Sequence, residues 1–219
     1  MKLPRPYIGS VTLSLLVAAW TIGVVNDAFW TRTIAAFGDH RQAMMAFAIG
    51  ISALLTVLSI SVTLKYIAKP IYIIAIFSAA AAAWFMEKFG VIIDMDMIRN
   101  AAQTTPSEAG HLMTPAFFRH MALYAVLPSV LIAMVRIRHR NFFAKLKWNT
   151  AVTAPLLLLA AVMTLWQYPA IASTLRNNRI IIKTLNPVSP IFNAIKYAVA
   201  EDKNRDIVAA PLDPDARPG

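Results

Sequence analysis

The feature that most constrains this chain is the stretch from Ala43 to Leu64, which contains no charged residue. An α-helix needs about 20 predominantly apolar residues to cross the roughly 30 Å hydrocarbon core of a bilayer. A soluble domain seldom contains a run of that kind, because its surface helices keep a polar face toward water. The stretch therefore predicts a membrane-spanning helix.

Four further apolar runs accompany this stretch. Together the runs predict spans at about residues 7–29, 43–64, 70–88, 115–136 and 148–171. The tryptophans mostly fall near the ends of these runs, as in the aromatic belts at membrane surfaces. We therefore expect an all-α, polytopic membrane protein, with a domain of five transmembrane helices over residues 1–172.

Composition agrees with a membrane location and excludes several kinds of site. The chain is 58% hydrophobic and 15% charged, whereas soluble domains carry about 25% charged residues. Its net charge of +10 comes from basic residues between the apolar runs, which favours membrane orientation over nucleic-acid binding. Because the chain has no cysteine, a disulfide, an iron–sulfur cluster and a thiolate zinc site are excluded.

The distribution of lysine and arginine predicts the orientation. Basic residues without acidic neighbours precede the first run, fill the second connection and crowd the fourth: Lys2, Arg5, Lys65, Lys69, Arg136, Arg138, Arg140, Lys145 and Lys147. The first and third connections mix basic with acidic residues. Since cytoplasmic loops are enriched in lysine and arginine, we expect a bacterial inner-membrane protein with a cytoplasmic N-terminus and a periplasmic C-terminus.

Three segments are neither spans nor short loops. Residues 89–114 are amphipathic, and residues 173–200 combine apolar clusters with basic residues. Both are typical of periplasmic helices that lie in the headgroup layer. Residues 201–219 become polar and proline-rich, which is linker composition. We expect them to lead to a C-terminal domain that this sequence does not include.

The chain carries no recognisable catalytic set. HExxH, GxSxG and a phosphate-binding glycine loop are all missing from the sequence. The histidines are His40, His111, His120 and His139. His111 and His120 follow Glu108 on the outer side, but their spacing matches no metal-ligand pattern. We therefore predict neither catalytic nor metal-binding residues here.

Asn100, Thr104 and Glu108 recur at intervals of four residues. On one continuous helix they would share a face at the level of the headgroups. Glu108 could then pair with the ammonium of a lipid headgroup, while Asn100 and Thr104 bond its phosphate or glycerol oxygens. This arrangement predicts a substrate-binding site for a lipid.

A structural role for the same segment stays open. The sequence Thr105-Pro106-Ser107-Glu108 is a capping box with proline at the first helical position. Pro106 also disfavours helical geometry at Thr105, so the continuous face would break there. Two other helix starts follow the same logic: Thr114-Pro115 before the fourth span, and Asn186-Pro187 before the last interfacial helix.

The outer segment resembles a known family of enzymes. The motif residues are Phe89-Gly90-Val91-Ile92-Ile93-Asp94, Met97-Ile98-Arg99-Asn100, Gln103-Thr104 and Glu108-Ala109. They resemble the lipid A phosphoethanolamine transferases, which include the mobilised colistin-resistance enzymes. Asn186-Pro187 followed by Ile195-Lys196-Tyr197 resembles the same family less specifically. The resemblance covers essentially the whole chain, as the N-terminal membrane domain of such an enzyme.

The resemblance implies a function. Family members move phosphoethanolamine from phosphatidylethanolamine to lipid A at the outer face of the inner membrane, using a zinc-activated threonine in a C-terminal domain. That domain, its zinc and its nucleophile would lie beyond residue 219, so the chain alone is predicted to be inactive. The residues matching Asn100, Thr104 and Glu108 help form the family's donor-lipid pocket. The alternative is a small non-enzymatic inner-membrane protein, such as a transporter subunit or an assembly factor.

Overall fold

A computed structural model describes residues 6–63, 66–138 and 141–205. Lys2, Arg5, Lys65, His139, Arg140 and most of the predicted linker lie outside these ranges. The elements, in chain order, are β1 (Tyr7–Gly9), α1 (Ser10–Gly23), α2 (Asp27–Phe37), α3 (Arg41–Ser61), α4 (Ala68–Phe89), α5 (Met95–Gln103), α6 (Pro106–Leu112), α7 (Pro115–Met121), η1 (Ala122–Val126), α8 (Leu127–Met134), β2 (Arg136–Arg138), α9 (Phe142–Trp166), α10 (Tyr168–Asn177), α11 (Ile180–Lys183) and α12 (Val188–Arg205). The predicted all-α fold class is confirmed.

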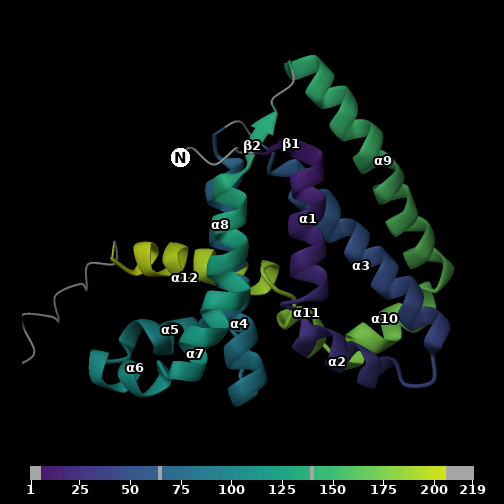
Figure 1. The fold of residues 1–219 in the computed structure, drawn as a ribbon. Helices are drawn as coiled ribbons and strands as arrows, with labels where there is room; N and C mark the ends of the chain where they lie inside the picture. Colours follow the sequence, from purple (N-terminus) through teal and green to yellow (C-terminus); the bar gives the residue numbers. More distant parts are fainter. Residues whose placement is uncertain (1–5, 64–65, 139–140, 206–219) are drawn as a thin grey trace, which may run out of the picture.

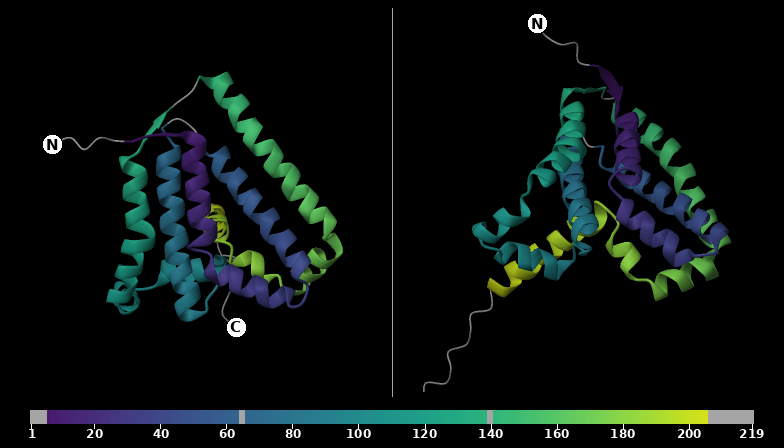
Figure 2. Two further views of the ribbon diagram at one scale, coloured as in Figure 1. Left: turned by 45° about the vertical axis from the view of Figure 1, so that its right-hand side comes forward. Right: turned by 60° about the horizontal axis from the view of Figure 1, so that its bottom comes forward.

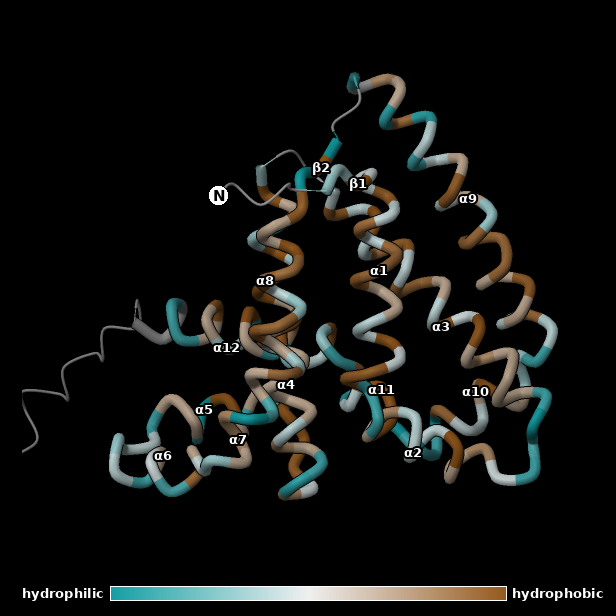
Figure 3. The backbone as a smooth tube through the Cα atoms, viewed as in Figure 1, coloured by the Kyte–Doolittle hydropathy of each residue, from teal (hydrophilic) through white to brown (hydrophobic). Residues whose placement is uncertain are grey.

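Four helical stretches are long and apolar enough to cross a membrane: α3, α4, the continuous α7–η1–α8 and α9. A fifth candidate is the pair α1 and α2, which is bent by 60°. Hydrophobic residues dominate these long helices (Figure 3). Four to five spans therefore match the expectation of a polytopic membrane protein.

The first predicted run does not continue as one helix to residue 29. Helix α1 ends at Gly23, and α2 starts at Asp27 in a new direction. At the bend, Asn26 leaves helical geometry, with φ −124° and ψ 28°, and its buried Nδ2 donates to the Thr21 carbonyl at 2.7 Å. That bond satisfies a buried carbonyl that lacks a partner within the helix at the end of α1, so the break is stabilised by a side chain.

The last helices also differ from their predicted bounds. Helix α9 begins at Phe142 and ends at Trp166, where Gln167 is no longer helical. Pro169 then lies in the first turn of α10, where a proline needs no amide hydrogen to donate. Helix α12 continues to Arg205, past residue 200, where the last interfacial helix was predicted to end.

A parallel two-stranded ribbon joins the start of α1 to the end of α8. Strands β1 and β2 pair with Tyr7 opposite Arg136 and Ile8 opposite Ile137. The Arg136 amide also donates to the Pro6 carbonyl at 2.9 Å. The sequence did not predict this pairing. It holds both chain segments at one end of the bundle, which we call the ribbon end (Figure 1).

The opposite end of the molecule carries the short helices. Helices α2, α5, α6, α7 and α10 gather there, while α12 packs against α4 and α5 (Figure 1). Two further views agree that α10 and α12 extend away from β1 and β2 (Figure 2). We call this the short-helix end. The bundle thus has two structurally different ends, separated by the apolar helices.

Two buried clusters hold the bundle together. The first joins α1, α4 and α8 around Val17, Ile76 and Ile132, and includes Ala79, Ala80 and Ala83 of α4. Small side chains let helices approach closely in a membrane, which explains the alanine run. The second cluster joins α2 and α3 to α10 and α11, around Phe29, Phe37, Phe47, Ile171 and Ile181.

Pro128 lies inside the α7–η1–α8 stretch, which continues through it as a helix. Proline has no amide hydrogen to donate to the carbonyl four residues earlier, which here belongs to Tyr124. The preceding residues form a π-helical turn, and the Trp20 Nε1–H of α1 donates to the Tyr124 carbonyl at 3.3 Å. A neighbouring helix therefore satisfies the freed carbonyl, as is common in membrane proteins.

Candidate functional site

The segment between α4 and α7 folds because each helix has a defined start or stop. Gly90 ends α4 in the left-handed region, with φ 68°, and its amide donates to the Met86 carbonyl at 3.1 Å. Asp94 caps α5 by accepting from the Met97 amide at 3.1 Å. These two residues end the candidate span and start a short helix.

The predicted capping box is present. The Thr105 hydroxyl accepts from the Glu108 amide at 3.4 Å, and Glu108 Oε2 accepts from the Thr105 amide at 3.0 Å. The Thr105 hydroxyl also donates to the same carboxylate at 3.0 Å. Helix α5 therefore ends at Gln103, and α6 starts at Pro106. The continuous helical face is broken where Pro106 predicted it.

The three predicted site residues fall on both sides of this break. Asn100 lies in the last turn of α5, and the Thr104 hydroxyl donates to the Asn100 carbonyl at 2.8 Å. Both residues line one cavity, whereas Glu108 is exposed in the first turn of α6 and is not among the residues that line it. The structure thus brings Asn100 and Thr104 together and leaves Glu108 beyond them.

That cavity has a volume of about 490 Å³ and an almost entirely apolar lining. Alanines on four elements leave the space: Ala81 and Ala82 on α4, Ala101 on α5, Ala109 on α6 and Ala194 on α12. Larger apolar walls come from Phe85, Met97 and Phe117, while Ser78, Asn100 and Thr104 supply polar groups. A mainly apolar cavity with a few placed polar groups is typical of a binding site for an amphipathic molecule.

Helix α12 is fixed against this cavity by polar contacts. Asn193 Nδ2 donates to the Ile93 carbonyl at 3.0 Å and to the Ser189 hydroxyl at 3.3 Å. The Lys183 ammonium of α11 lies 4.0 Å from the Asp94 carboxylate. Sequence reasoning missed Asn193, because it lies 100 residues from its partner and no local motif marks it.

Asn186 does not cap α12, which corrects the interpretation of Asn186-Pro187. Its Nδ2 donates instead to the Val25 carbonyl at 3.1 Å, and its Oδ1 accepts no hydrogen bond. Its backbone N–H and carbonyl both pair with the Asn26 side chain at 2.7 Å. The two asparagines are fully buried and join the end of α1 to the start of α12.

Two histidines, His111 and His120, lie on helices next to the site. His120 Nε2 lies 3.0 Å from the Ala80 carbonyl, and its ring lies 4.5 Å from Tyr124 and 5.3 Å from Trp84. His111 lies in the last turn of α6. Within the described ranges, no three histidine, aspartate or glutamate side chains gather closely enough to hold a metal ion.

Acid should weaken the capping box. Hydrogen bonds from the Thr105 backbone and hydroxyl lower the pKa of Glu108 below its usual 4.5. A lowered pKa stabilises the fold above the unfolded-state pKa, and that stability is lost as pH falls through the folded-state pKa. We therefore expect the first turn of α6 to fray as the pH falls below the ordinary pKa of a glutamate carboxyl, 4.5.

Amide hydrogen exchange would measure this fraying as a fall in the protection factor of the Thr105 amide. The control is the cap of α7, where Thr114 accepts from the Phe117 amide at 3.3 Å without a carboxylate. Equal loss of protection at Thr105 and Phe117 would show that the Glu108 carboxylate is not responsible.

The structure defines a polytopic helical membrane domain with a cavity at its short-helix end. A family model described as phosphoethanolamine transferase EptA/EptB matches residues 51–201. The chain therefore belongs to the EptA/EptB phosphoethanolamine transferase family, as an N-terminal membrane domain.

Similar proteins agree with this assignment. Phosphatidylethanolamine transferase Mcr-2 of Escherichia coli is 27% identical over 95% of this chain, and phosphoethanolamine transferase EptA of Escherichia coli K12 is 28% identical over 86%. The chain spans 39% and 36% of those two relatives. Integral membrane EptA of Neisseria meningitidis has a similar fold, with a TM-score of 0.84 over 94% of this chain at 20% identity.

Proposed function

We propose that this chain is the membrane part of a phosphoethanolamine transferase, and that its cavity binds the donor lipid phosphatidylethanolamine. The observation that supports this most directly is the pairing of Asn100 with Thr104 at an otherwise apolar cavity. Because the cavity lies at the short-helix end, a lipid headgroup could enter it from the membrane surface.

The side chains suit the parts of that lipid. The side-chain amide of Asn100 can donate to phosphate oxygens. The Thr104 hydroxyl donates to the Asn100 carbonyl, and its oxygen can at the same time accept from an ammonium. Phe85, Met97 and Phe117 contact the glycerol and the first methylenes of the acyl chains. Glu108, exposed on the next helix, attracts the ammonium electrostatically.

The acceptor and the catalytic chemistry complete the proposal. Lipid A phosphates would be attracted by Arg176 of α10, Arg179 just before α11 and Lys183 of α11. The transfer step and its zinc would belong to a further domain of the whole enzyme, so this chain by itself would bind lipid without turning it over. The ribbon end would face the cytoplasm, because its described segments carry basic residues and no acidic ones.

Filling the cavity tests donor binding. We expect Ala101→Trp to reduce phosphatidylethanolamine retention by about tenfold, because an indole would occupy the space where the headgroup and glycerol sit. The purified 219-residue chain would be mixed in detergent with equal amounts of phosphatidylethanolamine and phosphatidylcholine. Native mass spectrometry would then count the bound lipids.

The matched control is Ala102→Trp, an exposed neighbour on the same helix that does not line the cavity. It should leave phosphatidylethanolamine retention unchanged, and both variants should unfold at the temperature of the parent chain. If Ala101→Trp retains phosphatidylethanolamine as well as Ala102→Trp does, or if the parent chain does not prefer it to phosphatidylcholine, the cavity is not the donor site.

A further inference from the structure

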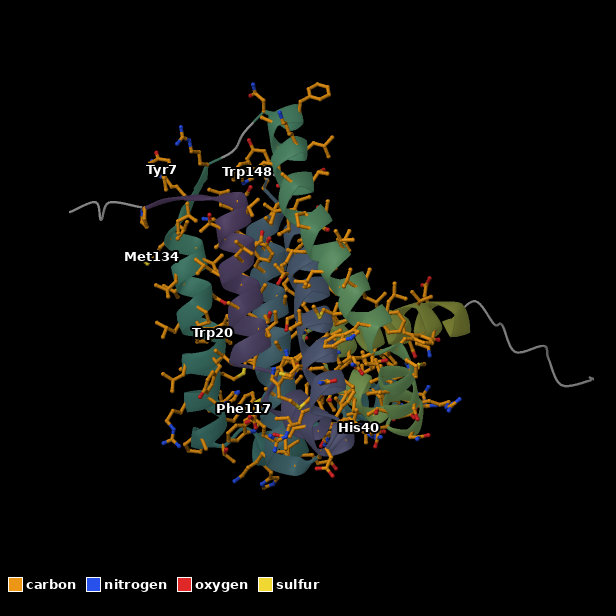
Figure 4. The ribbon with its side chains drawn as sticks, turned by 90° about the vertical axis from the view of Figure 1, so that its right-hand side faces the viewer. Tyr7, Trp20, His40, Phe117, Met134 and Trp148 are labelled. Carbon is orange, nitrogen blue, oxygen red and sulfur yellow. The ribbon has the colours of Figure 1, made fainter. Side chains whose placement is uncertain are left out.

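A second cavity lies at the ribbon end, at the opposite end of the bundle from the candidate donor site. Its volume is about 450 Å³, and its lining includes Tyr7, Tyr66, Lys69 and Arg136. Arg136 Nη1 donates to the Tyr7 hydroxyl at 3.1 Å, and its guanidinium carbon lies 5.9 Å from the centre of that ring. Figure 4 shows Tyr7 and Trp148 at the ribbon end, with Phe117 and His40 at the opposite end.

The charge of this end has one sign. Its segments 6–9, 62–63, 66–70, 135–138 and 141–147 contain Lys69, Arg136, Arg138, Lys145 and Lys147 but no aspartate or glutamate. The Lys69 ammonium donates to the Ala133 carbonyl at 3.0 Å and to the Val135 carbonyl, which holds its charge beside the cavity. The positive charges of Lys69 and Arg136, together with the Tyr7 hydroxyl, suit the binding of a phosphate group.

An apolar groove begins beside this cavity. It has a volume of about 290 Å³ between α1, α4 and α8, and it runs from Ile8 past Leu13 to Trp20. The eleven helical residues from Ser10 to Trp20 cover about 16 Å, while one leaflet of the hydrocarbon core is about 15 Å thick. Val135 lines both the cavity and the groove. The charged cavity is therefore continuous with an apolar groove about as long as the acyl chain of a phospholipid.

We propose that the ribbon end binds an anionic phospholipid of the facing leaflet, with its phosphate at Arg136 and Lys69 and one acyl chain in the groove between α1 and α8. The proposal does not depend on donor binding, because the two sites share no residue and lie at opposite ends of the bundle. The bound lipid would fill the space between the ribbon, α1 and α8.

The test compares phosphatidylglycerol with phosphatidylcholine, mixed in equal amounts with the purified 219-residue chain in detergent. Native mass spectrometry should show that the parent chain retains phosphatidylglycerol preferentially. Arg136→Gln should reduce that preference about fivefold, the effect expected of one basic residue at a membrane surface. Arg138→Gln removes the same charge from the same strand but does not line the cavity, and it should change the preference less than twofold.

Three further variants and one soluble competitor complete the test. Leu131→Trp should abolish phosphatidylglycerol retention by filling the groove, whereas Leu157→Trp on the exposed face of α9 should not. Arg136→Lys keeps the charge and should keep the lipid, which covers the case in which Arg136→Gln fails to fold. Soluble glycerol phosphate should not displace the lipid. Equal losses in Arg136→Gln and Arg138→Gln, retention in Leu131→Trp, or displacement by glycerol phosphate would overturn the proposal.

Discussion

Asn26→Ala should destabilise this domain by about 3 kcal/mol, one of the largest effects expected of a single side chain here. The substitution leaves three buried polar groups without their partner: the Thr21 carbonyl, the Asn186 carbonyl and the Asn186 amide. Each buried group that loses its hydrogen bond costs about 1–3 kcal/mol. The carbonyls cannot recruit water easily, because Asn26 and Asn186 are both almost completely buried.

Unfolding in a detergent–denaturant titration, followed by circular dichroism, would measure this loss. The matched control is Asn178→Ala, which removes a partly buried asparagine whose Nδ2 bonds only the Thr174 carbonyl, within its own helix end. That control should cost less than about 1 kcal/mol. Equal costs for the two variants would mean that the asparagine pair does not hold α12 to α1.

Gly50→Leu should separate α9 from the rest of the bundle. Helix α9 packs mainly along α3, and a side chain added at Gly50 would meet the Thr164 hydroxyl at 3.4 Å and the Ala160 carbonyl at 3.7 Å. A first carbon fits at these distances, but the remaining atoms of leucine do not. Overpacking of this kind costs about 1–3 kcal/mol, and α9 can relieve it by moving outward into lipid.

Spin labels would report the movement, because the chain has no native cysteine to compete with labelling. Labels on introduced cysteines at Ser61 and Lys147 lie near the contact in which Asn149 Nδ2 donates to the Thr63 hydroxyl at 3.1 Å. The distance between them should lengthen in Gly50→Leu and stay unchanged in Gly50→Ala. A distance unaffected by leucine would show that α3 and α9 are not closely packed at Gly50.

The spans were predictable because their signal is local. An uncharged run such as Ala43 to Leu64 has few alternatives to a membrane helix, whatever the rest of the chain does. The bend near Asn26 and the ribbon of Tyr7 with Arg136 were not predictable. Both depend on partners more than 100 residues away, and neither a lone asparagine nor a three-residue strand carries a periodic pattern.

The candidate site divides in the same way. The capping box of Thr105 and Glu108 follows from four consecutive residues, so sequence alone predicted it. The cavity beside Asn100 could not be predicted, because its walls come from α4, α5, α6, α7 and α12. Helical spacing predicted that Glu108 lies on the same face as Asn100. That prediction assumed one continuous helix, whereas the helix ends before Thr105 and a new one starts after it. The substrate role of all three residues stays a prediction.

The β1–β2 ribbon has a consequence for how the protein is made. Tyr7 leaves the ribosome long before Arg136, so the first strand must wait for its partner while the intervening segments are threaded into the bilayer. The two strands can meet only if the chain between them crosses an even number of times. A nascent chain that skipped one crossing would leave them separated by about 30 Å of hydrocarbon. The ribbon can therefore form only in a correctly inserted chain. In a wrongly inserted chain the backbone hydrogen-bonding groups of both strands would stay unpaired, and proteases could recognise them.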